Sequence, residues 1–274
     1  MYDFRTPEER EAAAAPDLAK PPALLTAAEV VRAAVEFPSS WVLDTVVPAR
    51  DEGDGRPVLV IPGFYGTDGL TGRLRGHLRR HGYHVHGWRL GRNVGLTDRL
   101  IDGLADRFAE IHARHGQPVS VVGWSFGGLL ARWLAHQRPA DVRQVLCLGS
   151  PWRAEGERTR STAMFERARA THGLSERARP MVEHLRGPVP VFTTAVWSKT
   201  DGVVSWRGCL VDEGPLSENI HVPSSHVGLV ANPFALAVVA DRLRQDPLAP
   251  EPFAWSRCLR ESLVGARSAV GATS

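Results

Sequence analysis

One serine of the chain stands in a spacing that suits nucleophilic chemistry. Ser125 has glycines two residues before it and two residues after it, in the stretch GWSFG at 123–127. An apolar run precedes this stretch and a longer apolar segment follows it, so the sequence predicts a sharp turn from a strand into a helix. A serine on such a turn takes an unfavourable backbone conformation, and the residues brought together around it must be tiny. We therefore interpret Ser125 as a nucleophile and not as part of an ordinary loop.

A serine hydroxyl is a weak nucleophile at neutral pH, so this interpretation requires a base. His226 lies in a loop directly after a short predicted strand at 219–222, and the ordinary pKa of a histidine suits proton transfer near neutral pH. His221 is the alternative, but it lies within that strand and is expected to point into the packing of the sheet. We predict His226 as the base.

The base in turn needs an acidic group to orient it. Asp201 lies in a loop just past the predicted strand at 189–196, and a glycine and two valines that can bury its backbone follow it. An aspartate before a glycine is also common in plain turns. Asp212, the next candidate, stands in an acidic stretch that we expect to be solvated. We predict Asp201 as the orienting acid, which gives the order serine, acid, histidine along the chain.

Negative charge that develops on a substrate oxygen needs two hydrogen-bond donors, and backbone amides supply them. We expect one from Phe126, directly after the serine, and one from Phe64, in the loop after the predicted strand at 57–61, with Tyr65 as the second choice. Aromatic residues flank these loops, which favours an apolar acyl site over a sugar or nucleotide site. We predict that the side chains of Tyr65 and Trp124 contact the substrate.

The elements that must position these residues alternate along the chain. Short apolar runs predict strands at 57–61, 83–88, 119–124, 142–148, 189–196 and 219–222. Longer amphipathic segments between them predict helices at about 68–81, 97–114, 126–137 and 233–244. Alternation of this kind predicts the α/β class, with a mostly parallel central sheet flanked by helices on both faces.

The length of 274 residues suits a single domain, 1–274, in which three segments are added to the alternating core. Residues 1–50 are expected to form a helical N-terminal arm, with a strand near 41–47 as an alternative within it. Residues 152–187 are rich in arginine and glutamate and are expected to form a small helical cap insertion above the edge of the sheet. Residues 247–274 are expected to form a loosely attached tail.

Six motifs, IPGFYGTDG, GRNVG, GWSFGG, GSPW, SKTDGVV and SSHVGL, together resemble the α/β-hydrolase fold family, and within it the lipase- and esterase-like bacterial hydrolases. The resemblance covers residues 57–245 and implies a mostly parallel sheet, no cofactor and an acyl-enzyme on Ser125. Two features depart from the family pattern. Pro62-Gly63 opens the oxyanion loop where many relatives have His-Gly, and the leading antiparallel strands are expected to be reduced or absent.

The composition argues against several other classes of protein. The formal net charge is +3, with positive and negative side chains interspersed, so no nucleic-acid partner is expected. The N-terminal stretch is too polar for a secretory signal, and no run is apolar enough for integral membrane association, so a cytoplasmic location is expected. The pattern H-x-x-H-x-H at 81–86 runs into a predicted strand without a carboxylate or cysteine to complete a metal site, so no metal is expected. Three cysteines, Cys147, Cys209 and Cys258, also lack metal-ligand spacing and are expected to be reduced thiols.

The candidate residues together predict a serine esterase or lipase that acts on a small-molecule or lipid ester. Three alternatives stay open at this point. The same three residues could transfer the acyl group to an alcohol or amine, or they could cleave an amide or a lactone. A noncatalytic binding protein of the same fold is the third alternative, because a fold alone does not determine function.

Overall fold

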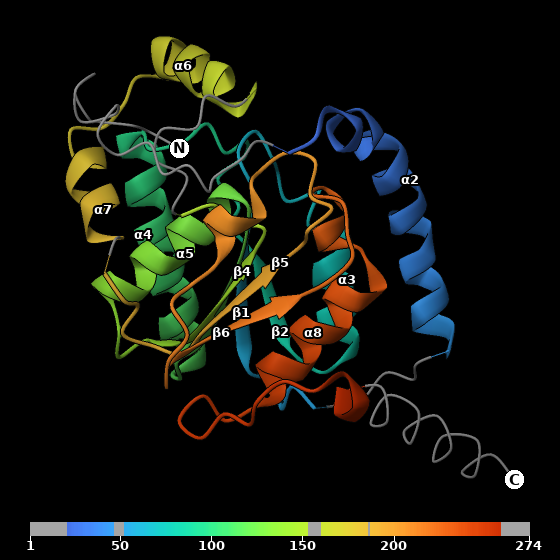
Figure 1. Ribbon diagram of the computed structural model, residues 1–274. Helices are drawn as coiled ribbons and strands as arrows, with labels where there is room; N and C mark the ends of the chain where they lie inside the picture. The colour runs from blue at the N-terminus through green and yellow to red at the C-terminus, as the bar shows by residue number, and fades with distance from the viewer. Residues whose placement is uncertain (1–20, 47–51, 153–159, 186, 259–274) are drawn as a thin grey trace, which may run out of the picture.

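The computed structural model describes residues 21–46, 52–152, 160–185 and 187–258. In this part of the chain six strands form one parallel sheet, in the order β2-β1-β3-β4-β5-β6 (Figure 1). The strands are β1 (Pro57–Ile61), β2 (His84–Gly87), β3 (Val119–Trp124), β4 (Val142–Leu148), β5 (Thr193–Trp197) and β6 (Ser217–His221). The predicted α/β class with a parallel central sheet is confirmed.

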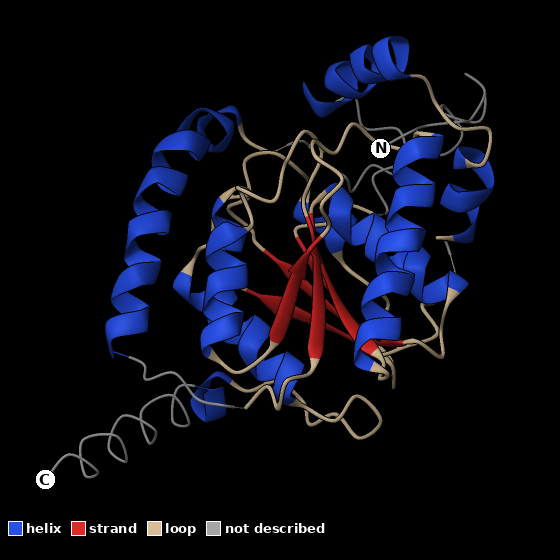
Figure 2. Cartoon of the chain, turned by 180° about the vertical axis from the view of Figure 1, so that it is seen from behind, coloured by secondary structure: helices blue, strands red, loops and turns tan. Residues whose placement is uncertain are grey.

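Helices cover both faces of this sheet (Figure 2). On one face lie α4 (Asp98–His115), α5 (Phe126–Gln137) and α7 (Ala178–His184), and on the other lie α3 (Gly72–Arg80) and α8 (Pro233–Arg244). The remaining elements are α2 (Ala23–Val46), α6 (Arg160–His172) and two short 3-10 helices, η1 (Trp206–Cys209) and η2 (Gly228–Val230). α2 forms an outer layer that packs against α8 and η2.

Each face of the sheet has its own hydrophobic core. Successive residues of a strand point to opposite faces, so a strand covered on both sides must be apolar at every position. Leu59 and Val121 belong to the core under α4 and α5, whereas Val58 and Val122 belong to the core under α3 and α8. The continuous apolar runs of β1 and β3 therefore follow from the coverage of both faces.

The first described helix, α2, turns its polar side inward. Glu29 is only 5% exposed, whereas Leu24, Val31 and Val35 are 79%, 68% and 67% exposed. The helix extends to Val46, so residues 41–46 are helical and do not form the alternative strand. Once a helix exists, each further residue adds a hydrogen bond at little cost, which favours continuation over a new strand.

β5 begins at Thr193, four residues later than the predicted start at 189. Pro190 has no amide hydrogen and cannot donate to a ladder in the middle of a sheet. The parallel register with β4 accordingly starts where Val145 pairs with Thr193. Val189 is buried in the core, so its apolar character reflects packing and not strand pairing.

Two helices occupy the segment that was predicted as a helical cap. α7 places Met181 and Val182 in the core beside α5, whereas α6 lies near the carboxyl ends of the strands (Figure 1). Residues 153–159 and 186 of that segment lie outside the described residues, and a role as a cap stays a prediction. In the predicted tail, Phe253 and Trp255 pack against the core under α8, and residues 259–274 lie outside the described residues.

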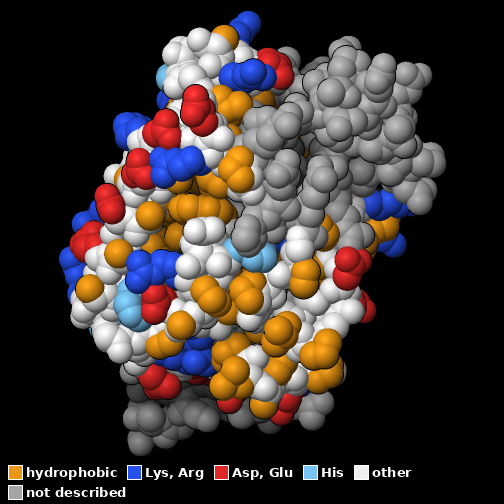
Figure 3. Space-filling view, turned by 90° about the vertical axis from the view of Figure 1, so that its left-hand side faces the viewer, with side chains coloured by type: hydrophobic (Ala, Val, Ile, Leu, Met, Phe, Trp, Pro, Cys, Tyr) orange, Lys and Arg blue, Asp and Glu red, His pale blue; other side chains and the backbone are white. Residues whose placement is uncertain are grey.

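Charged side chains of both signs share the surface. On the face of the molecule drawn in Figure 3, Lys and Arg side chains lie beside Asp and Glu side chains along the left-hand side. None of the helices in the described ranges combines the length and the hydropathy that a bilayer crossing requires.

Candidate active site

Ser125 lies on a sharp turn between β3 and α5. Its backbone has φ 54° and ψ −124°, which is a strained conformation for a residue with a side chain. A Cβ on Gly123 would come within 2.3 Å of the carbonyl oxygen of Gly127, and a Cβ on Gly127 would come within 2.3 Å of the carbonyl oxygen of Ile61. The glycine spacing therefore has a steric cause, as the sequence analysis argued.

The side chains of His226 and Asp201 form a buried pair. Nδ1 of His226 lies 2.7 Å from Oδ2 of Asp201, and the two residues are 4% and 3% exposed. Oδ1 of Asp201 accepts hydrogen bonds from the amides of Val203 and Val204, each at 2.8 Å. An ionised carboxylate can only accept hydrogen bonds, so Nδ1 of His226 carries the proton and Nε2 is the basic nitrogen.

The pKa of His226 is raised above its ordinary value. Burial disfavours the charged imidazole and lowers this pKa, but three contributions together outweigh burial. They are the negative charge of Asp201, the hydrogen bond to Asp201 and the negative charge of Glu29. The imidazole is therefore a stronger base than an exposed histidine, and its positive form is stabilised after it has taken a proton.

Ser125, Asp201 and His226 follow the carboxyl ends of β3, β5 and β6, and the end of β4 connects the serine with the buried pair. The amide of Ser125 donates to the carbonyl oxygen of Leu148, the last residue of β4, at 2.8 Å. A Cβ on the next residue, Gly149, would lie 3.3 Å from Nδ1 of His226 and 3.4 Å from Oδ2 of Asp201. The end of β4 thus touches the serine turn on one side and the buried pair on the other.

Trp124 contacts His226 through both its ring and its side-chain nitrogen. It is 5% exposed and belongs to the core under α8. Its Nε1 donates to the carbonyl oxygen of His226 at 2.9 Å, and the centroids of the two rings lie 5.7 Å apart. Trp124 thus holds the base loop, which we define as residues 223–228, and its contact with the substrate stays a prediction.

The loop after β1 presents the amide of Phe64 near the serine. Tyr65 has φ 57°, and its amide donates to the carbonyl oxygen of Asn93 at 2.7 Å. Within the described ranges, no acceptor takes a hydrogen bond from the amide of Phe64. A Cβ on Gly63 would lie 3.0 Å from Cβ of Ser125, which places this loop directly beside the serine. The geometry favours Phe64 over Tyr65 as a donor to a bound oxyanion.

Asn93 braces this loop, although the sequence analysis assigned it no role. Its side chain is fully buried. Nδ2 donates to the carbonyl oxygen of Pro62 at 2.8 Å, and Oδ1 accepts from the amide of Gly95 at 3.2 Å. The backbone amide of Asn93 also donates to the carbonyl oxygen of Gly66 at 2.9 Å. In the sequence, the motif GRNVG, which contains Asn93, was the one signal that could have pointed to this role.

Aromatic rings form an apolar surface next to the serine. Phe126 is the first residue of α5, Phe64 comes from the loop after β1, and Phe165 comes from α6. The ring centroid of Phe165 lies 3.9 Å from that of Phe64 and 5.6 Å from that of Phe126. Tyr65 meets Phe64 edge-on at 4.7 Å. Through Phe165, α6 therefore contacts the loop after β1 and the first residue of α5.

Two carboxylates of α2 also reach the candidate site, and sequence reasoning missed both. Glu29 accepts hydrogen bonds from the amides of Gly202 and Val227, at 3.1 and 2.8 Å. Glu36 accepts a hydrogen bond from the amide of Ser225 at 2.8 Å. One of these amides follows Asp201 directly, and the other two flank His226.

The two rejected candidates, His221 and Asp212, are both exposed. His221 was expected to point into the packing of the sheet, but it is exposed, because β6 is an edge strand and His221 is its last residue. Its ring centroid lies 4.8 Å from that of Trp197. Asp212 is exposed, as its acidic surroundings indicated.

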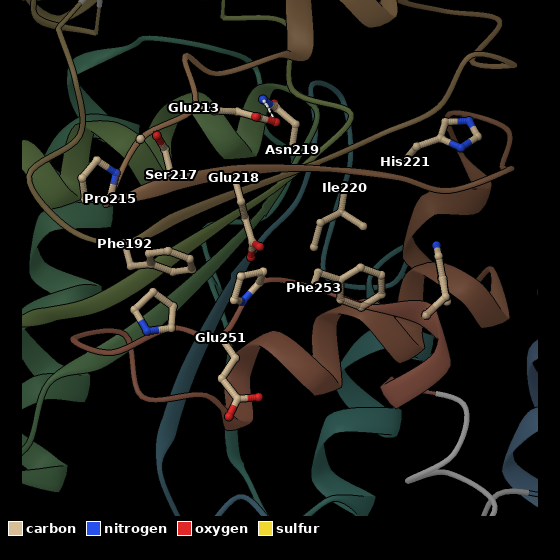
Figure 4. A pocket seen from close by; sticks show the side chains of 14 residues that line it. Phe192, Glu213, Pro215, Ser217, Glu218, Asn219, Ile220, His221, Glu251 and Phe253 are labelled. Carbon is tan, nitrogen blue, oxygen red and sulfur yellow. Dashed lines mark hydrogen bonds between the residues drawn. The ribbon is translucent and has the colours of Figure 1, made fainter.

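A cavity of about 520 Å³ lies along β6, and Figure 4 shows its lining. Ser125, Asp201 and His226 are not among the lining residues. Its carboxylates already have partners within the protein: Glu218 pairs with Arg242 at 3.3 Å, and Glu213 accepts from Asn219 at 3.3 Å. This cavity is therefore separate from the candidate active site.

No family model matches the chain, and no curated protein matches it. Solved structures do match. Lipase B of Aspergillus fumigatus has a TM-score of 0.59 and 19% identity, over 80% of this chain and 63% of that chain. A structure from LipS and LipT, described as metagenome-derived lipolytic enzymes, has a TM-score of 0.53 and 17% identity, over 70% of this chain and 94% of that chain. The mature lipase BlEst2 of Bacillus licheniformis has a TM-score of 0.50 and 14% identity, over 72% and 93%.

This chain spans less than two thirds of the length of the lipase B chain, at 63%. At these identities the likeness concerns the arrangement of the backbone. The parallel sheet and the helices on both of its faces agree with it. The protein therefore has the α/β-hydrolase fold.

Proposed function

We propose that this protein is a serine hydrolase that cleaves carboxylic esters. In this proposal Ser125 is the nucleophile, His226 the base and Asp201 the acid that orients the base. One observation carries the proposal: a buried histidine and aspartate, 2.7 Å apart, lie at the same sheet edge as a serine held at φ 54°. The lipolytic enzymes among the matching structures support the same reaction class.

The proposed reaction starts when Nε2 of His226 takes the proton of the Ser125 hydroxyl. The serine oxygen then attacks the ester carbonyl, and the negative charge of Asp201 stabilises the imidazolium. The imidazolium returns the proton to the departing alcohol, which leaves an acyl group on Ser125. Water, deprotonated by the same imidazole, attacks the acyl carbon. The bond from that carbon to the oxygen of Ser125 then breaks, the imidazolium returns its proton to this oxygen, and the carboxylic acid leaves.

The amides of Phe64 and Phe126 are the proposed donors to the oxyanion that forms in both steps. Phe126 opens α5, and the positive end of a helix dipole favours negative charge at that place. Removing one donor of this kind lowers kcat on the order of 100- to 1,000-fold in acyl-transfer enzymes. The apolar surface of Phe64, Phe126 and Phe165 suits the acyl half of an ester.

Labelling with a fluorophosphonate probe tests the nucleophile, because the probe reacts with an activated serine. We expect the wild-type protein to be labelled and the Ser125→Ala variant to be neither labelled nor active on p-nitrophenyl esters. Ser150→Ala is the matched control, since Ser150 is 1% exposed and lies near the same strand ends. Full labelling of Ser125→Ala would overturn the proposal.

Substrate panels then separate hydrolysis from the other reactions of an acyl-enzyme. We expect p-nitrophenyl esters with acyl chains of several lengths to be cleaved to the free acid. Addition of an alcohol acceptor reveals acyl transfer as a new ester product, and amide and lactone substrates test the remaining reactions. An ester product that exceeds the free acid would identify a transferase and contradict hydrolysis.

A further inference from the structure

We propose that α2 is a positioning element of the catalytic machinery, in which the Glu29 carboxylate bridges the loop that carries Asp201 and the loop that carries His226. This inference rests on the proposed function. We define the acid loop as residues 198–204, and the base loop has been defined as residues 223–228. The helix lies outside the alternating core, and nothing in the proposed chemistry by itself requires it.

Glu29 makes the bridge with its two carboxylate oxygens. Oε2 accepts from the amide of Gly202, the residue after Asp201, at 3.1 Å. Oε1 accepts from the amide of Val227, the residue after His226, at 2.8 Å. Glu29 is 5% exposed, and a carboxylate that accepts two backbone amides in such a place makes strong, charge-assisted hydrogen bonds. One side chain therefore fixes the distance between the two loops.

Other side chains of α2 hold each loop separately. On the acid loop, Thr26 donates to the carbonyl oxygen of Gly202 at 2.7 Å, and Arg32 donates to Oγ1 of Thr200 at 2.9 Å and also to the carbonyl oxygen of Thr200. These hydrogen bonds hold the residues on either side of Asp201. They use the side of α2 that faces inward, while the valines of the helix face outward.

On the base loop, Glu36 is the main contact from α2. It accepts from the amide of Ser225 at 2.8 Å and from the hydroxyl of Ser225. It also accepts from the side-chain amide of Asn232 at 3.3 Å. Glu29 and Glu36 are seven residues apart, which is two helical turns, so both lie on the same face of α2.

Two glycines of the loops are explained by the close approach of α2. A Cβ on Gly202 would lie 2.4 Å from the carbonyl oxygen of Leu25 and 2.7 Å from Oε2 of Glu29. A Cβ on Gly228 would collide with Oε2 of Glu36. Neither glycine has a positive φ, so the need for glycine comes from this contact and not from the backbone conformation. The motifs SKTDGVV and SSHVGL therefore contain the docking site of α2 as well as Asp201 and His226.

The charge of Glu29 acts on His226, and this effect distinguishes it from a simple structural contact. Burial lowers the pKa of His226, and the charges of Asp201 and Glu29 raise it. Three other charged groups lie on the surrounding elements. On α2, Arg32 is hydrogen-bonded to Thr200 and Glu36 to Ser225. On the acid loop, Lys199 is exposed and lies near the ring of Trp206. Gly149, directly after β4, lies beside the pair, and Trp124 of β3 contacts His226; neither residue carries a charge.

The test replaces Glu29 by its neutral isostere. In Glu29→Gln the negative charge is lost, so the pKa of His226 falls relative to the wild type. NMR of protein with labelled histidine measures this directly, with His226→Gln to assign the signal. The acidic limb of kcat/KM for an ester moves to lower pH in the same variant, because the imidazole stays neutral at lower pH. A merely structural defect would lower activity at every pH and leave the limb in place.

Two matched variants separate charge from anchoring. Glu36→Gln removes a carboxylate from the same face of α2, and Thr26→Val removes a hydrogen bond to the acid loop without a change of charge. We expect both to leave the pKa of His226 at its wild-type value. Glu29→Ala removes the charge and both hydrogen bonds, and we expect kcat to fall on the order of 10- to 100-fold with KM nearly constant.

The outcomes distinguish this inference from the proposed function. An unlabelled and inactive wild type would defeat the proposed function, whereas the NMR titration of His226 would still test the bridge. A labelled and active wild type in which Glu29→Gln leaves the pKa of His226 unchanged would overturn the inference alone. If Glu29→Gln does not fold, Glu29→Asp is the second variant, because it keeps the charge on a side chain too short to accept from the amides of both Gly202 and Val227. A wild-type kcat in Glu29→Asp would also overturn the inference.

Discussion

His226 donates the proton of its Nδ1 to Oδ2 of Asp201 across 2.7 Å, at a place where both side chains are almost completely buried. The other oxygen of Asp201 accepts from the amides of Val203 and Val204. The carboxylate is thus held by the backbone of its own loop, and the imidazole is held by the carboxylate. The orientation of Nε2, the proposed base, therefore depends on the acid loop.

Asp201→Asn is expected to reverse the tautomer of His226 without loss of the fold. The side-chain oxygen of the asparagine can still accept from the amides of Val203 and Val204, so its NH₂ group must face Nδ1 of His226. Nδ1 then becomes an acceptor, Nε2 carries the proton, and the base cannot take the proton of Ser125. We expect kcat to fall on the order of 10⁴-fold, measured with p-nitrophenyl esters. Thermal unfolding is the control, and a loss below tenfold would contradict the proposed role of Asp201.

The pH dependence of kcat/KM follows from the environment of His226. Because the pKa of this histidine is raised in the folded protein, the neutral base is present only above a pH that exceeds the ordinary histidine value. We expect kcat/KM to rise with pH through that raised pKa and then to level off. The measurement is kcat/KM for a water-soluble ester in buffers of constant ionic strength. A midpoint below the ordinary pKa of histidine would be inconsistent with this arrangement.

The elements of the core could be predicted because their patterns are local. β4 and α5 have the predicted bounds, since a buried strand and a buried helix each require apolar residues at their own period. β5 starts late because sequence periodicity cannot distinguish a buried extended segment that contains Pro190 from a paired strand. The packing of Trp124 in the core under α3 and α8 was not foreseen, because the sequence shows its adjacency to the serine and not the face of the sheet to which its side chain points.

The contacts of α2 could not be predicted because they join residues that are far apart in sequence. Glu29 and Gly202 are separated by 173 positions. A glutamate on a helix usually indicates a solvated face, and the exposed valines of α2 suggest the opposite orientation from the one observed. The glycines after Asp201 and His226 were the available signal, but a glycine in a loop is more often explained by turn geometry.

Because α2 packs closely against the acid loop, we expect a methyl group at position 202 to lower both stability and kcat. In Gly202→Ala the new Cβ would lie 2.4 Å from the backbone of Leu25, so either α2 or the acid loop must move. We expect the free energy of unfolding to fall by about 1–3 kcal/mol and kcat to fall with it, as measured by urea denaturation and ester turnover.

Gly76→Ala is the matched control for that substitution. Gly76 lies within α3, and a Cβ there would have no neighbour within 4 Å. We expect this change to raise the free energy of unfolding by about 1 kcal/mol, because alanine is the better helix former. A Gly202→Ala variant as stable and active as the wild type would show that α2 does not pack on the acid loop in solution.

The position of Phe165 leads us to expect that this residue affects the preference for long over short acyl chains. Its ring lies 3.9 Å from that of Phe64, the proposed oxyanion donor, and 5.6 Å from that of Phe126. Phe165→Ala removes this ring beside Phe64 and Phe126, so a long acyl chain that packs there loses apolar contact while an acetyl group loses little. We expect kcat/KM for a long-chain p-nitrophenyl ester to fall about tenfold relative to kcat/KM for the acetate. Met164→Ala on the same helix is the control, since Met164 is 45% exposed, and an unchanged ratio in both variants would mean that the acyl chain binds away from α6.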